Sequence, residues 1–151
     1  MNQIAQLNIG RFRYPTNDPR MAEFMGNLDR INALAERSAG FVWRLKDESN
    51  NATAIRPESA PTMAVNLSVW ESVEALERFV WATVHKQFYN RKREWFDALS
   101  KPHFVMWPVE PGHIPSLDDA MARLEHLTEH GDSDFAFGWG HLPHIKLRKC
   151  G

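Results

Sequence analysis

The sequence predicts a single α+β domain, and three observations lead to this prediction. Segments with alternating apolar side chains, typical of strands, are interspersed with segments whose apolar residues recur at helical spacing. The chain has 151 residues, a length that suits one domain. Its 43% hydrophobic and 25% charged residues are ordinary for a globular protein. A core of normal size is therefore expected without disulfide bonds.

The N-terminal segment predicts a strand followed by a helix. Residues 4–12 alternate between apolar and polar side chains, which favours a strand. Asp18 followed by Pro19 is a typical helix start, because aspartate caps free N–H groups and proline at the first helical position loses no hydrogen bond. Apolar residues then follow helical spacing as far as Gly40, which we expect to end the helix.

The middle of the chain predicts a hairpin and a second helical region. Residues 41–45 and 63–70 are expected to be strands, joined by a long polar loop over 46–61. Ser72 can cap the helical pattern that follows, which extends over residues 73–99. That length exceeds the usual range for one helix, so we expect a kink or break near residues 83–86.

The C-terminal part predicts a fourth strand and a third helix. Residues 103–109 are expected to form the strand. Ser116 and Asp119 form a capping box, and the helix that follows is expected to stop at Gly131. Three alternating aromatic residues then suggest a small final strand or an apolar strap: Phe135, Phe137 and Trp139.

These elements follow the order β-α-β-β-α-β, which is the ferredoxin-like split βαβ order. Two helices then cover one face of a four-stranded sheet, and little of the chain is left for the other face. We therefore expect a second copy to cover it, giving a homodimeric α+β barrel. The expected domain covers residues 1–140, with a core at 1–110, a helical extension at 111–140 and a tail at 141–151.

Charge and cysteine content exclude several classes of protein. The formal net charge of −1 argues against general binding of nucleic acid or of a membrane surface, because both need a strong positive field. No apolar run approaches the length of a membrane span, and no signal peptide is visible. The single cysteine, Cys150, fits a reducing compartment, so we expect a cytoplasmic protein.

Polar side chains share one face of the first and third predicted strands. Asn66, Ser68 and Trp70 alternate on one strand, and Gln6 and Asn8 alternate on the other. A buried amide without a partner costs about 1–3 kcal/mol, so buried amides need partners. The two asparagines therefore either hydrogen-bond each other in a structural network or line a cavity that holds water or a ligand.

A family resemblance rests on these same residues. Residues 66–72, Asn-Leu-Ser-Val-Trp-Glu-Ser, followed by Val-Glu-Ala-Leu and then His85, resemble the strand-to-helix segment of the dimeric α+β barrel superfamily. That superfamily includes the antibiotic-biosynthesis monooxygenases. The whole chain, including Pro-Val-Glu-Pro-Gly-His-Ile-Pro at 108–115, resembles a bacterial branch of it with a domain of unknown function.

The resemblance implies a small-molecule enzyme of the cofactor-independent monooxygenase type, acting on a flat, apolar, oxygenated substrate. Asn8, Asn66 and Trp70 stand at positions that match site residues of enzymes that oxidise anthrone-type substrates with O₂. In such a mechanism the amides would polarise substrate oxygens and stabilise a developing enolate. No cofactor and no metal are expected, and the expected partners are a small-molecule ligand and a second copy of the chain.

His85 is the further catalytic candidate, because histidine titrates near neutrality and can act as a base. Trp81 and Tyr89 lie four residues to either side and share its helix face. Together with Trp43 and Trp107 they are the candidate substrate-binding residues. The alternatives for His85 are a structural histidine at a helix kink or a ligand of haem iron.

His126 and His130 are four residues apart and could bind a metal, but no carboxylate or cysteine partner is evident. Three hypotheses therefore remain open: a monooxygenase-like enzyme, a non-catalytic ligand-binding or interaction protein of the same fold, and a haem-binding barrel protein.

Overall fold

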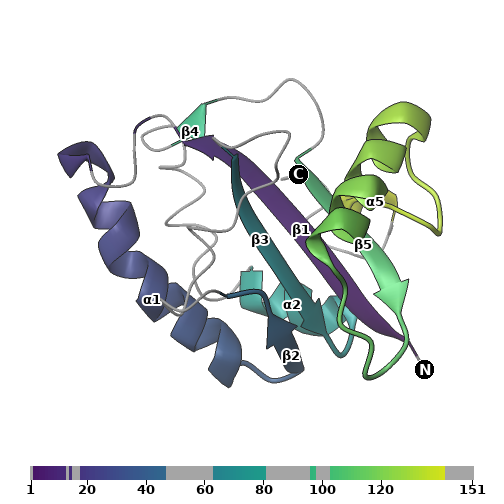
Figure 1. Ribbon diagram of the computed structural model, residues 1–151. Coiled ribbons are helices and arrows are strands. Elements are labelled where there is room, and N and C mark those ends of the chain that lie inside the picture. The colour runs from purple at the N-terminus through teal and green to yellow at the C-terminus, as the bar shows by residue number, and fades with distance from the viewer. Residues whose placement is uncertain are drawn as a thin grey trace.

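The computed structural model describes residues 2–12, 14, 18–46, 63–80, 96–97 and 103–141. Its centre is a five-stranded antiparallel sheet (Figure 1). The strands are β1 (Gln3–Phe12), β2 (Phe41–Arg44), β3 (Met63–Trp70), β4 (Phe96–Asp97) and β5 (Phe104–Val109). β1 lies in the middle, with β3 and then β2 on one side and with β4 and β5 on the other. The four strands predicted from alternation are confirmed, and the fold is α+β and ferredoxin-like.

The helices begin at the predicted caps. They are η1 (Pro19–Met21), α1 (Ala22–Arg37), α2 (Val73–Phe79), α5 (Leu117–His130) and η3 (Trp139–His141). Asp18 accepts the Arg20 backbone N–H at 2.8 Å, and hydrogen bonds from the Arg20 side chain help to lower the pKa of this carboxyl to about 2. Ser72 and Ser116 cap α2 and α5, each accepting a backbone N–H at 3.1 Å. Asp119 does not complete the capping box, because its carboxylate contacts Arg123 Nε at 3.4 Å.

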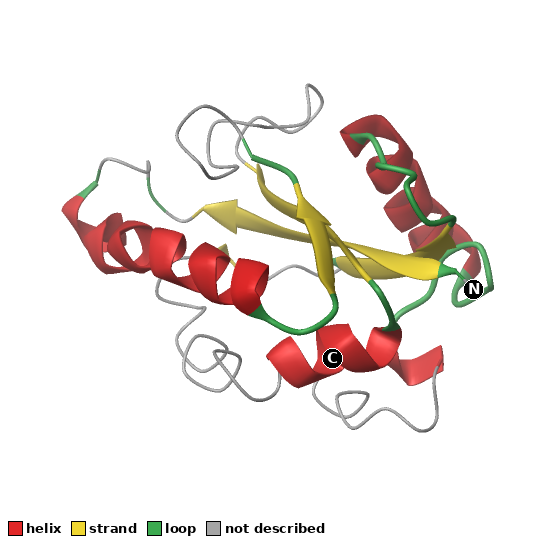
Figure 2. Cartoon of the chain, turned by 90° about the horizontal axis from the view of Figure 1, so that it is seen from below, coloured by secondary structure: helices red, strands yellow, loops and turns green. Residues whose placement is uncertain are grey.

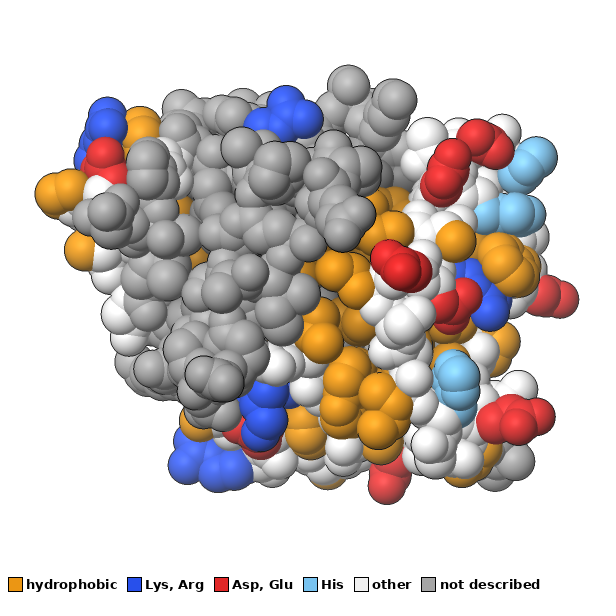
Figure 3. Space-filling view, viewed as in Figure 1, with side chains coloured by type: hydrophobic (Ala, Val, Ile, Leu, Met, Phe, Trp, Pro, Cys, Tyr) orange, Lys and Arg blue, Asp and Glu red, His pale blue; other side chains and the backbone are white. Residues whose placement is uncertain are grey.

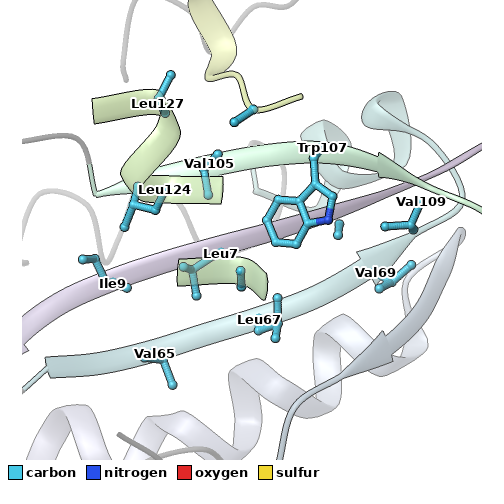
Figure 4. Packing of buried hydrophobic residues seen from close by; sticks show 13 residues of the cluster. Leu7, Ile9, Val65, Leu67, Val69, Val105, Trp107, Val109, Leu124 and Leu127 are labelled. Atoms are coloured by element: carbon cyan, nitrogen blue, oxygen red, sulfur yellow. The ribbon is translucent and has the colours of Figure 1, made fainter. Parts of the chain in front are cut away.

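The sheet separates two apolar clusters. Figure 2 shows α5 on one side of the sheet and α2 on the other. On the α5 side, Leu7, Leu67 and Trp107 pack with Leu124 and Leu127 (Figure 4). The opposite side of the sheet lies against α1 and α2, and we call this side the helix face. The aromatic and apolar cluster on it includes Ile4, Ala35, Trp70, Leu76 and Met106.

The expectation that little of the chain remains for the second sheet face is wrong. α5 packs across that face over β1 and β5, and Leu7 and Trp107 are fully buried within one chain. The apolar stripe of this helix predicts that one of its sides is buried but does not indicate its docking site. A partner chain is therefore not needed to cover this part of the sheet.

The prediction of the second helical region is wrong at its C-terminal end. Phe96 and Asp97 form β4 and pair with Phe12 and Arg11 at the end of β1, whereas the apolar pattern predicts helix as far as residue 99. Adjacent apolar residues fit either period, and the end of β1 offers backbone groups that need partners. The predicted break near residues 83–86 lies outside the described residues, as do residues 47–62 and the tail beyond residue 141.

The aromatic segment after α5 is a strap across β5. Its backbone makes one bridge, in which Phe137 and Met106 exchange hydrogen bonds of 2.7 and 2.9 Å. Trp139 then stacks on Phe104, with the ring centroids 5.2 Å apart. This packing covers the helix face beside β5. Within the described part of the chain, no helix is both long and apolar enough to cross a membrane.

Candidate functional site

The predicted polar residues meet on the helix face of β1 and β3. The antiparallel register sets Asn8 opposite Asn66, and Gln6 opposite Ser68. Directly opposed residues share a face and have neighbouring side chains. Trp70 follows Ser68 on the same face, opposite Ile4. The structure therefore brings Asn8, Asn66 and Trp70 onto one surface, together with Gln6 and Ser68.

A hydrogen-bonded network connects four of these side chains. Gln6 Nε2 donates to Asn66 Oδ1 and to Ser68 Oγ, each at 2.8 Å, and lies 3.3 Å from the Asn66 backbone carbonyl oxygen. Trp70 Nε1 donates to Ser68 Oγ at 2.9 Å. The network is buried at one end and open at the other. Trp70 is 1% exposed, Ser68 6% and Gln6 5%, whereas the asparagines Asn66 and Asn8 are exposed.

Trp70 forms the buried end of this network. Its ring stacks on Phe79 of α2 with centroids 5.2 Å apart, and it meets Phe41 of β2 edge-on at 5.5 Å. The indole N–H points at Ser68, so Trp70 joins the core to the polar row. The sequence places Trp70 among the catalytic candidates, and the structure places it at the buried end of the row, next to Ser68.

Arg44 adds a positive charge to the same face. It lies opposite Ser68 in the pairing of β2 with β3, and its side chain is 7% exposed. Arg44 Nη2 lies 3.5 Å from Glu36 Oε1 of α1. Buried charges are paired in this way because desolvation of a lone charge is unfavourable. Arg44 therefore extends the polar row onto β2, with its charge offset by Glu36.

Gln6, Ser68 and Arg44 are the site residues that sequence reasoning missed. Alternation places Gln6 and Ser68 on the right faces of their strands, but only the strand register sets them opposite each other. Arg44 ends a strand of four residues that has an irregular register, and so carries little periodic signal. A register prediction for β1 against β3 would have found the first two residues.

Trp43 and Trp107 lie on the opposite face of the sheet. Trp107 is paired with Ala5 and is 0% exposed in the cluster under α5, and Trp43 packs against the same cluster. The sheet separates both side chains from Asn66, so they cannot line one site with it. Their expected role as substrate-binding residues beside the amides is therefore corrected to packing in the core.

The histidine candidates divide into two groups. His85 lies outside the described residues, together with Trp81 and Tyr89. His126 and His130 are in contact, with ring centroids 4.5 Å apart. Among the described residues, however, no group of three or more His, Cys, Asp and Glu side chains could hold a metal ion.

Solved structures with the same fold have low sequence identity to this chain. SnoaB, a cofactor-independent oxygenase from Streptomyces nogalater, is 16% identical with a TM-score of 0.51. The match covers 77% of this chain and all of SnoaB. A conserved protein from Methanosarcina mazei Go1 is 13% identical with a TM-score of 0.50, covering 73% of this chain and 93% of that protein. At this identity the likeness supports the fold alone.

Sequence comparison identifies the family of this chain. No curated protein sequence matches it. Residues 3–149 match a family described as a domain of unknown function, and the chain therefore belongs to the DUF3291 family.

Proposed function

We propose that this protein is a cofactor-independent monooxygenase-like enzyme that acts on a flat, apolar, oxygenated substrate. The observation that supports this function is the polar row on the helix face, where an exposed Asn66 is held by a buried Gln6. Ligand-binding sites combine apolar surroundings with a few placed polar groups, and this row supplies such polar groups. SnoaB has the same fold and is a cofactor-independent oxygenase, which makes this class of chemistry a candidate here.

The proposed reaction needs only substrate and O₂. An anthrone-type CH₂ group loses one proton to give an enolate, and the enolate carbon then bonds to O₂. The O–O bond breaks as the second C–H proton leaves. One oxygen atom stays as a carbonyl and the other departs as water. The balance is R₂CH₂ + O₂ → R₂C=O + H₂O, in which the substrate supplies all four electrons.

The residues of the row divide this work. Asn66 and Asn8 face the substrate oxygens with their amide N–H groups and stabilise the enolate as its charge develops. Arg44 lies opposite Ser68 on the neighbouring strand and is paired with Glu36. We assign the removal of the first proton to His85, since a histidine can accept a proton near neutral pH.

Replacing Asn66 tests this proposal directly. We expect the wild-type protein to consume one O₂ for each anthrone oxidised, followed with an oxygen electrode and by quinone absorbance. Asn66→Ala is expected to lower kcat/KM by about 10²–10³-fold, as for the loss of one oxyanion-hole donor. Asn2→Ala, at an exposed asparagine that is not part of the row, is the matched control and should keep wild-type rates. If the wild-type protein oxidises neither anthrone nor related phenolic substrates, the oxygenase proposal is wrong.

A non-catalytic ligand-binding protein of this fold is the second candidate. Gln6 and Trp70 both donate to Ser68 Oγ without a ligand, as in a structural network. Binding of anthrone without consumption of O₂ would favour this function. The haem alternative depends on His85 alone, and a sample that takes up no added haemin would exclude it.

We also propose that the protein forms a homodimer. Figure 3 shows a band of apolar side chains beside α5, on the face of the molecule that carries this helix. Among the described residues, the exposed large apolar side chains are Val42, Ile114 and Phe135. Exposed apolar patches often mark interfaces, since burial stabilises by about 25 cal/mol per Å². Sedimentation at micromolar concentration is expected to give twice the mass of one chain, and the mass of a single chain would contradict the dimer.

A further inference from the structure

We infer that Gln6 is a positioning residue that orients the exposed Asn66 amide and the buried Ser68 hydroxyl as two hydrogen-bond donors for the anionic, oxygen-bearing edge of a flat ligand. The inference deepens the proposed function and rests on it for the identity of that ligand. It adds two residues, Gln6 and Ser68, to the working part of the site. It also specifies the ligand form that is bound, which is a phenolate or enolate and not the neutral phenol or ketone.

The orientation of the Gln6 amide follows from its neighbours. One of its contacts is the backbone carbonyl oxygen of Asn66, which can only accept a hydrogen bond. The amide atom on that side must therefore be Nε2 and not Oε1. Its two hydrogens are directed to the contacts at 2.8 Å, Asn66 Oδ1 and Ser68 Oγ. Gln6 itself is buried, so this orientation is set by the fold before any ligand arrives.

Ser68 is thereby left with one possible role. Its hydroxyl oxygen has two lone pairs, and both accept hydrogen bonds, one from Gln6 Nε2 and one from Trp70 Nε1, which can only donate. The hydroxyl hydrogen must then lie in the remaining tetrahedral direction. Among the described residues, no acceptor takes this hydrogen. Ser68 is therefore an oriented donor whose capacity to accept is already used.

The Asn66 side-chain amide is also oriented by Gln6. Its Oδ1 accepts the Gln6 N–H, so its Nδ2 amide hydrogens are directed away from Gln6 on an exposed side chain. Residues two apart on a strand have Cα atoms about 6.5 Å apart, and their side chains point the same way. The row therefore presents two donors on one face of β3, from Ser68 and Asn66, with Arg44 opposite Ser68 on β2.

This arrangement discriminates between charge states of a ligand. A neutral phenol cannot donate its O–H to Ser68, because both lone pairs of the Ser68 oxygen already accept hydrogen bonds; it can only accept from Ser68, as a weaker, uncharged acceptor. An ionised oxygen accepts both donors, and hydrogen bonds to a charged group are roughly twice as strong as neutral ones. The bound anion is therefore favoured, and the pKa of a bound phenol is expected to fall.

The experiment measures that pKa without turnover. The full chain is titrated with 2-hydroxyanthraquinone under anaerobic conditions, and the phenolate absorbance of the bound dye is followed against pH. We expect the wild-type protein to lower the pKa of the dye by at least one unit. Gln6→Met and Ser68→Ala are each expected to lower the phenolate-to-phenol ratio of the bound dye about tenfold relative to the wild-type protein. This is the effect of losing one charged hydrogen bond. Ser68→Thr keeps the hydroxyl and should restore the shift.

Gln3→Met is the matched control, because it makes the same change on β1 at a residue of the opposite face. It should leave the pKa of the bound dye unchanged. An unshifted pKa on the wild-type protein would overturn the inference. The inference would also be overturned if Gln6→Met or Ser68→Ala bound the dye more weakly but still lowered its pKa, because a merely structural role predicts that result. If the protein lowers the pKa of the dye but never consumes O₂, the oxygenase proposal is wrong and the present inference stands. If Gln6→Met does not fold, Ser68→Ala alone tests the inference.

Discussion

Truncation of either fully buried tryptophan to alanine is expected to lower the free energy of unfolding by about 3–5 kcal/mol, but only Trp70→Ala should also abolish activity. Trp107 is 0% exposed under α5, and Trp70 is 1% exposed against Phe41 and Phe79. Each truncation leaves a cavity of similar size on one face of the sheet. Total stabilities are about 5–15 kcal/mol, so either variant loses much of its margin. Urea unfolding followed by circular dichroism measures the loss.

The phenylalanine variants separate packing from hydrogen bonding at the same two positions. Trp70→Phe removes the Nε1–H that Ser68 accepts at 2.9 Å, which adds about 1–3 kcal/mol to the packing loss. Trp107→Phe removes a buried Nε1–H for which the described part of the chain provides no partner. That removal relieves an unfavourable burial, so the net loss should be smaller. Trp107→Phe should also keep wild-type kcat/KM, whereas Trp70→Phe should lower it.

Equal stability losses for the two phenylalanine variants would contradict the role given to the Trp70 indole. A loss of activity in folded Trp107→Phe would contradict the assignment of Trp107 to the core and return it to the substrate-binding residues. The pair is well matched, because both side chains leave the sheet at fully buried positions and lie on opposite faces.

The sequence predicts most of this fold because the local signals are strong. Apolar and polar residues alternate through the middle of β1 and β3, over residues 5–9 and 65–69, so the existence and the two faces of these strands follow from the sequence. Asp18, Ser72 and Ser116 mark helix starts through a local hydrogen bond that depends on a few residues only. Such signals need no information on distant parts of the chain.

The docking of α5 and the pairing of β4 could not be predicted in this way. The apolar stripe of α5 fits any apolar surface, and the sheet offers two faces. β4 is two residues long, which is too short to show a period. Both features depend on contacts between segments far apart in the sequence.

The candidate site could be predicted only in part from the sequence. Asn8, Asn66 and Trp70 could be placed on one face from alternation, and the structure confirms that they share it. The hydrogen bonds of Gln6 depend on the β1–β3 register, in which a shift by one residue would turn the row to the other face. Tertiary pairing therefore decides which polar residues work together, although the sequence predicts which of them are available.

Gly40→Ala is expected to be the most damaging small substitution in the described part of the chain. Gly40 has a φ of +87°, a conformation in which an L-residue is strained by about 1–2 kcal/mol. An added methyl group would also overlap the Cβ of Ala75 in α2. The Gly40 carbonyl accepts the backbone N–H of Glu71 at 2.7 Å, so the loop is fixed against the start of α2. We expect a loss of more than about 3 kcal/mol, which combines strain with overpacking.

Gly112→Ala provides the control for strain alone. Gly112 has a φ of +88°, but an added Cβ would meet no atom within 4 Å. Its loss of stability should therefore stay near the 1–2 kcal/mol of left-handed strain, roughly what any residue other than glycine would suffer there. The double variant Gly40→Ala with Ala75→Gly removes the overlap and should recover stability, despite the roughly 1 kcal/mol that glycine costs inside a helix. Additive losses in this cycle would mean that the contact between Gly40 and Ala75 is not what limits the substitution, because only touching residues couple.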